Sequence, residues 1–177
     1  MTVPTLYLAG LQARKFHGPG RKLCAMVLPR RWEHGDGRVA IAAPSEADLR
    51  AVRVIWDLAA YRAACERWWG VFASLHRYDP GVLSLVSVAS NEADGRARAR
   101  PVADGDTLFC GCAAPDSPRR KHPCHICILA PFLARAGWRV VLWGRALFWD
   151  GRGCRWEDTG EEMTPEQFGW PNTETIR

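Results

Sequence analysis

Apolar runs bounded by polar or glycine-rich turns predict the buried strands of a sheet. The clearest runs lie at residues 5–11, 23–28 and 138–143, and residues 107–109 are expected to form the end of a fourth buried strand. Runs of four to eight such residues between turn signals are typical of buried strands. We expect these four segments to lie in one sheet, with two further strands at residues 39–42 and 82–89.

Apolar positions at spacings of three and four predict helices. Residues 45–69 carry such a stripe after Ser45, which is a good N-cap. A second helix is expected from about Cys124 to Gly137, although Pro131 removes one amide donor inside it. Residues 107–144 therefore form a strand, loop, helix, strand unit, the crossover that parallel neighbours require. We predict a single α/β domain with a mainly parallel sheet flanked by helices.

Length and charge suggest one domain with a distinct tail. A chain of 177 residues suits one compact domain, which we expect at residues 1–154. Residues 155–177 hold two arginines against six acidic residues and are predicted to form an acidic C-terminal tail. Residues 91–100 are polar without apolar periodicity and are predicted to form a surface loop.

The first predicted strand leads directly into a basic loop. Residues 12–22 hold four cations, two glycines and a histidine, in a chain whose net charge is +5. Glycines let a backbone approach a phosphate closely, and cations neutralise it. The loop is not a Walker A motif, and a flexible turn with solvated cations is the alternative. The candidate ligand-binding residues are Arg14, Lys15, His17, Gly18, Gly20, Arg21 and Lys22.

A cysteine cluster follows the central predicted strand. The pattern CxC…CxxC supplies thiols in two closely spaced pairs, which is how structural zinc sites collect four ligands. The same donors suit an iron–sulfur cluster, and reduced thiols without metal are the alternative. The candidate Zn²⁺ ligands are Cys110, Cys112, Cys124 and Cys127, with His122, His125 or Cys154 as possible replacements.

The same residues also suggest nucleophilic chemistry. Cys124 lies near the expected start of a helix, where the helix dipole lowers the pKa of a thiol. His125 or His122 is close enough in sequence to act as its base. Cys124 and His125 are therefore candidate catalytic residues.

Seven cysteines and the absence of a basic segment before the first apolar run favour reduced thiols and a cytoplasmic protein. No segment approaches the roughly 18 apolar residues of a membrane span, so no membrane partner is expected.

These motifs, in this order, resemble the domain-of-unknown-function family numbered four hundred and eighty-eight. The resemblance is carried by residues 5–11, 14–22, 107–112, 124–125 and 137–142. Ile126 stands where that family has an arginine in a Cys-His-Arg turn. The resemblance implies a layered α/β fold and work on nucleotides or nucleic acids, without implying a reaction.

We therefore expect binding of a phosphate-bearing ligand, a nucleotide or nucleic acid, beside the cysteine cluster. One alternative is a nucleotide-processing transferase or hydrolase that uses Cys124 and His125. The other is a protein–protein interaction module whose partner the sequence does not identify.

Overall fold

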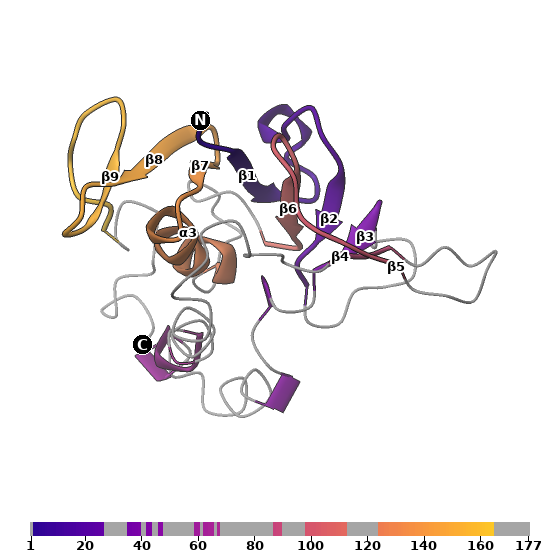
Figure 1. Ribbon diagram of the computed structural model, residues 1–177. Coiled ribbons are helices and arrows are strands. Elements are labelled where there is room, and N and C mark those ends of the chain that lie inside the picture. The colour runs from indigo at the N-terminus through magenta and orange to yellow at the C-terminus, as the bar shows by residue number, and fades with distance from the viewer. Residues whose placement is uncertain are drawn as a thin grey trace.

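Nine strands form one sheet across the described part of the chain. The structure, a computed structural model, describes residues 2–26, 35–39, 42–43, 46–47, 59–60, 62–65, 67, 87–89, 98–112 and 124–164. The strand order across the sheet is β5-β4-β3-β2-β6-β1-β7-β8-β9 (Figure 1). The strands are β1 (Thr5–Gly10), β2 (Lys22–Cys24), β3 (Gly37–Arg38), β4 (Ser87–Ala89), β5 (Arg98–Arg100), β6 (Thr107–Cys110), β7 (Arg139–Leu142), β8 (Arg145–Trp149) and β9 (Cys154–Trp156).

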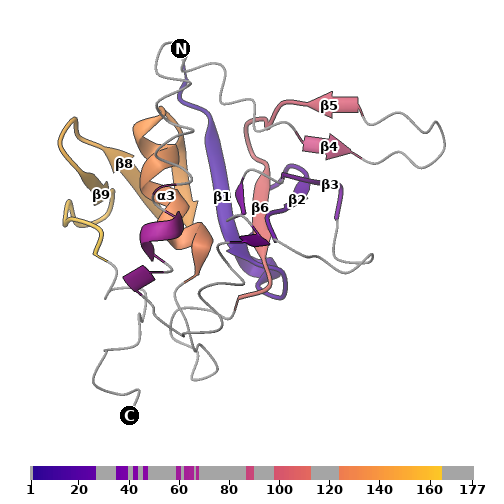
Figure 2. The ribbon, with the colours of Figure 1, turned by 90° about the horizontal axis from the view of Figure 1, so that it is seen from below.

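The sheet is mixed. The five central strands β3, β2, β6, β1 and β7 run parallel, with four parallel pairings between them. Four antiparallel pairings add β4 and β5 at one edge and β8 and β9 at the other, and Figure 2 shows the β4–β5 hairpin extending away from the central strands. The prediction of a mainly parallel sheet flanked by helices is therefore wrong. The parallel arrangement holds only for the centre.

A tight hairpin ends the parallel part of the sheet. Leu142 pairs with Arg145, so Trp143 and Gly144 form a two-residue loop, with φ values of 50° and 87°. Two positive φ angles define a type I′ turn, which matches the twist of an antiparallel pair. A positive φ costs an L-residue such as Trp about 1 kcal/mol. Burial of the Trp143 ring offsets this cost. The ring packs edge-on against the Phe16 ring, with the two ring centroids 6.1 Å apart.

The next hairpin extends the sheet into the predicted acidic tail. The Asp150 carboxylate accepts the N–H groups of Arg152 and Gly153, both at 2.7 Å. It also accepts a hydrogen bond from Arg155, which is the main reason that the pKa of Asp150 lies well below its usual range. The predicted boundary between residues 154 and 155 therefore falls inside β9, and residues 165–177 lie outside the described residues.

Other predicted elements agree with the structure to differing degrees. The strand β3 ends at Arg38, just before the strand expected at residues 39–42, of which residues 40–41 lie outside the described residues. The loop predicted over residues 91–100 is wrong at its end, because residues 98–100 pair with β4. Within the predicted helix at 45–69, the described residues 46–47, 59–60, 62–65 and 67 are helical.

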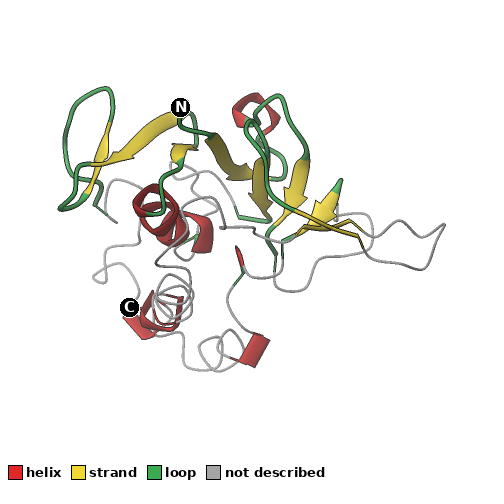
Figure 3. Cartoon of the chain, viewed as in Figure 1, coloured by secondary structure: helices red, strands yellow, loops and turns green. Residues whose placement is uncertain are grey.

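One face of the sheet is covered by α3 (His125–Arg135), which packs against β1, β6, β7, β8 and β9 (Figure 3). Cys124 is its N-cap, and Gly137, with φ of 98°, follows its C-cap and ends it as predicted. The helix continues through Pro131. Its buried residues are His125, Ile126, Cys127, Ile128, Leu129, Ala130, Leu133 and Ala134.

The other face is covered by the loop that follows β1. The His17 ring stacks on Phe109, with ring centroids 6.4 Å apart, and the Gly18 N–H donates to Thr107 Oγ1 at 2.9 Å. Figure 3 shows the short 3-10 helix η1 (Arg14–Phe16) on the opposite side of the sheet from α3. A helix and a basic loop thus enclose the central strands.

An ion pair between a buried carboxylate and a partly exposed arginine fixes the end of this loop. Asp106 is 2% exposed, and its carboxylate accepts a hydrogen bond from the Arg21 guanidinium, with 2.6 Å between Nη2 and Oδ2. It also accepts the backbone N–H groups of Arg21 at 2.9 Å and Ala103 at 2.8 Å. One carboxylate therefore holds the start of β2 to the turn before β6.

Replacing Asp106 with Ala leaves these donors without their acceptor. We expect the free energy of unfolding, measured by urea denaturation, to fall by about 3 kcal/mol. Glu157→Ala is the control, because it breaks the exposed Arg139–Glu157 pair, whose side chains are 41% and 34% exposed. That change is expected to cost less than about 1 kcal/mol. Equal losses in the two variants would contradict a buried anchoring role for Asp106.

Candidate metal centre

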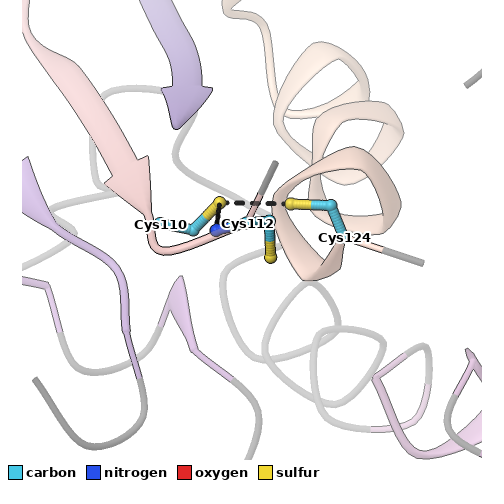
Figure 4. A group of neighbouring side chains, drawn as sticks. All are labelled: Cys110, Cys112 and Cys124. Carbon is cyan, nitrogen blue, oxygen red and sulfur yellow. Dashed lines mark hydrogen bonds between the residues drawn. The ribbon is translucent and has the colours of Figure 1, made fainter. Parts of the chain in front are cut away.

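Three cysteines meet where β6 ends and α3 begins. Cys110 is the last residue of β6, Cys112 follows after a bend, and Cys124 is the N-cap of α3 (Figure 4). Parallel strands end at the same edge of a sheet, and α3 starts above that edge. The predicted convergence of the thiols at positions 110 and 124 is confirmed.

The sulfur atoms are close enough to share one ion. Cys110 Sγ lies 3.2 Å from Cys124 Sγ, and all three Sγ atoms lie within 4.8 Å of one another. Zn–S bonds of about 2.3 Å in a tetrahedron place sulfurs roughly 3.8 Å apart. The Cys110–Cys124 sulfur distance of 3.2 Å is shorter than this value, and the 4.8 Å limit for all three sulfurs is longer. Three close cysteines that could hold a metal ion are therefore present.

Burial shapes the chemistry of these thiols. Cys110 and Cys124 are 0% exposed, whereas Cys112 is partly exposed. Burial, followed by side-chain hydrogen bonds shared with Cys112 and Cys124, raises the pKa of Cys110 well above its usual value. Cys110 is therefore protonated at neutral pH when no cation is present. A bound metal ion reverses this preference, because a coordinating thiol is deprotonated outright.

Among the described candidates for the fourth ligand, none is part of this group. Cys127 is buried in α3, and its sulfur does not belong to the set that lies within 4.8 Å. His125 Nε2 donates to the Ala25 carbonyl at 2.5 Å and so fixes α3 to the end of β2. His122 lies outside the described residues. Cys154 lies in β9, four strands from β6, where burial and then Asp150 raise its pKa to about 12.

The hydrogen bond of His125 also bears on the catalytic hypothesis. Its Nε2 is engaged by a backbone carbonyl, and its side chain is 6% exposed. Cys124 is fully buried beside Cys110. A nucleophile and base need mutual hydrogen-bonding reach and access to a substrate. The catalytic roles of Cys124 and His125 stay a prediction.

The structure separates the predicted phosphate-binding loop from the thiols. His17 and Gly18 pack on the face of the sheet that carries Thr107 and Phe109. Side chains alternate along a strand, so Cys110 belongs to the opposite face, where it meets α3. The expectation that the loop lies beside the cysteines is therefore wrong.

At the end of the loop, Arg21 and Lys22 bond to other groups of the protein. Arg21 pairs with Asp106, and the Lys22 ammonium donates to the carbonyls of Gly18 and Gly20. A Cβ at Gly20 would lie 2.7 Å from the Gly105 carbonyl carbon. At Gly20, the missing side chain therefore lets the backbone of the loop lie close to the backbone of Gly105.

Two of the predicted cations remain at the surface. Arg14 and Lys15 are exposed in η1, and neither has an ion-pair partner among the described residues. Lys15 Nζ lies 4.7 Å from the centre of the Phe16 ring. The His17 ring differs from these two side chains, because its Nε2 is hydrogen bonded to the Gly10 carbonyl at 2.9 Å.

Sequence reasoning missed Ala25 and Asp106, whose contacts position the centre and the loop. Ala25 bonds to a residue 100 positions away, and Asp106 pairs with one 85 positions away. Alanine offers no side-chain signal, and an Asp-Gly-Asp sequence is typical of an ordinary turn. Only the aligned ends of β2 and β6 reveal these roles.

Comparison of the chain with protein-family models, curated proteins and solved structures finds no match. The resemblance to the family numbered four hundred and eighty-eight stays a prediction, as does the cytoplasmic location. None of the helices in the described ranges has the length and apolar character needed to cross a bilayer.

The exposure of the thiols predicts their order of reaction. In metal-free, reduced protein, we expect iodoacetamide to modify Cys112 first, because the other six cysteines are buried. Peptide mass spectrometry after short exposures measures the order. Full unfolding in urea should make all seven react at similar rates. Early modification of Cys110 or Cys124 in the folded protein would contradict this arrangement.

Proposed function

We propose that the protein is a zinc-binding protein in which Cys110, Cys112 and Cys124 supply three thiolate ligands. The observation that carries the proposal is the grouping of the three sulfurs within 4.8 Å. Thiolates are the commonest ligands of structural zinc, and such sites take four ligands in a tetrahedron. Cys127, the predicted fourth ligand, lies outside this group, and the predicted alternate His122 stays a prediction.

Zinc at this position would join two elements. Cys110 and Cys112 end the β6 segment, and Cys124 begins α3, so one ion would close the chain between residues 112 and 124. Metal binding of this kind contributes directly to folding free energy. A stabilising, structural role is therefore the one that the geometry supports best.

Metal analysis tests this proposal. Purified protein should contain about one equivalent of zinc, and a Cys112→Ser/Cys124→Ser variant should contain almost none. Cys154→Ser is the matched control, because it removes a buried thiol at the far edge of the sheet. His122→Ala tests the fourth ligand. Full zinc content in the double variant, or none in the wild type, would overturn the proposal.

A second candidate function is binding of a phosphate-bearing ligand, a nucleotide or nucleic acid. It is supported by the exposure of Arg14 and Lys15 on η1. Cations that contact phosphates make binding salt-dependent, because each contact releases counterions. The remaining alternative, a protein–protein interaction module, also stays a prediction.

An oligonucleotide titration tests the second candidate. With a labelled single-stranded oligonucleotide, we expect Arg14→Ala/Lys15→Ala to weaken binding and to lower the slope of affinity against salt by about 2. Fluorescence anisotropy measures both quantities. Arg145→Ala is the control, because that cation is paired with Asp158. An unchanged slope in the double variant would rule out these two contacts.

A further inference from the structure

Two of the three clustered sulfurs face each other. Cys110 Sγ lies 3.2 Å from Cys124 Sγ, and Figure 4 shows the two sulfurs pointing toward one another, one from the end of β6 and one from the start of α3. A disulfide bond is about 2.05 Å long, so the two atoms need to approach by roughly 1.2 Å to form one. A bond between them would join the sheet to the helix that covers it.

The backbone is anchored at both of these cysteines. The Leu11 N–H donates to the Cys110 carbonyl at 2.7 Å, which fixes the end of β6 to the end of β1. On the helix side, His125 directly follows Cys124, and its Nε2 is hydrogen bonded to the Ala25 carbonyl at 2.5 Å. Because both backbones are held, bond formation requires small side-chain movements and no rearrangement of the fold.

Cys112 links this buried pair to solvent. Cys110 and Cys124 are 0% exposed, whereas Cys112 is partly exposed and its sulfur lies within 4.8 Å of both of theirs. Figure 4 shows the Cys112 sulfur pointing away from the line that joins the other two. Oxidation of cysteine follows the exposure of the thiol. An oxidant from solvent therefore reaches Cys112 before it reaches the buried pair.

We propose that the three cysteines form an oxidation site at which hydrogen peroxide reacts with Cys112 and leaves a disulfide between Cys110 and Cys124. In the first step, the Cys112 sulfur bonds to one peroxide oxygen, the O–O bond breaks, and water leaves a sulfenic acid behind. Cys124 on the facing element then displaces this hydroxyl, which leaves as a second water with the thiol proton of Cys124. Cys110 finally attacks Cys124 in the mixed disulfide, and Cys112 leaves as a thiol with the proton of Cys110. Two thiols are oxidised by two electrons, and one peroxide is reduced to two waters.

This reaction needs only the three thiols, so it goes beyond the proposed zinc site. Where that site is filled, the two proposals are linked, because the disulfide consumes two of the three thiolate ligands. Oxidation would then release the ion and replace a metal link between β6 and α3 by a covalent one.

Peptide mapping of the full-length protein tests the proposal. Reduced protein, stripped of metal with a chelator, is treated with one equivalent of hydrogen peroxide, alkylated with iodoacetamide in urea and digested with trypsin. Residues 119–121 are Arg, Arg and Lys, so trypsin separates the two halves of the cluster. We expect two linked peptides, and their fragmentation should place the bond between Cys110 and Cys124 and the alkyl group on Cys112.

Variants test the role of Cys112 as the point of entry. In Cys112→Ser, the Cys110–Cys124 disulfide should form at least about tenfold more slowly, because the remaining two thiols are buried. Cys154→Ser is the matched control, since it removes a buried thiol at the far edge of the sheet and should leave the rate unchanged. An unchanged rate in Cys112→Ser would overturn the entry role.

The outcomes separate this proposal from the zinc site. Protein that binds zinc but, when stripped of it, forms no Cys110–Cys124 link overturns the oxidation site alone. Protein that forms the link but binds no zinc overturns the metal centre alone. A link in the stripped protein, with release of zinc from the loaded protein on peroxide treatment, supports both.

Discussion

The insertion of β6 between β1 and β2 determines where every sulfur of the candidate metal centre lies. In this arrangement Gly10 pairs with Cys110, and Cys24 pairs with Phe109. The four residues of β6 are at most 1% exposed. A shift of the strand by one residue would turn Cys110 to the opposite face, away from α3. The parallel register therefore decides whether the thiols of β6 and α3 can meet. The partly buried Arg21–Asp106 pair holds the chain at the opposite end of the same strands.

The meeting of Cys110 and Cys124 could be predicted from sequence because it depends on order alone. A strand, a loop and a helix that leads to a parallel strand must bring the strand's end near the helix's start. The observed 3.2 Å between the two sulfurs agrees with that argument. The position of Cys127 could not be predicted in the same way. The rotation of a helix about its axis is set by the side chains that pack beneath it, and α3 buries Cys127 together with Ile126 and Ala130.

The two main errors have a common physical origin. A basic loop after a strand can cover either face of the sheet, and only the packing of His17 on Phe109 shows that it covers the face opposite the thiols. Likewise, β8 and β9 are short, and their turns contain Gly144, Gly151 and Gly153, so the local sequence gives little sign that they add antiparallel strands to the sheet. Antiparallel pairing becomes visible only when β7 provides the edge on which those strands add.

Burial and charge together explain why a metal ion is a better partner for these thiols than a cationic side chain. Burial, Cys112 and Cys124 all raise the pKa of Cys110, and no described cation lowers it. The cations of the basic loop lie on the other face, where Arg21 is bound to Asp106 and Lys22 to backbone carbonyls. Among the described residues, the N-terminus of α3 supplies a fixed positive potential beside these thiols, but its effect is only about half a unit charge. Three thiolates at a buried strand end would repel one another, and a bound cation is what would make that arrangement stable. In the part of the chain that the structure describes, no cation supplies the countercharge that three thiolates would need, so these three cysteines could hold a metal ion.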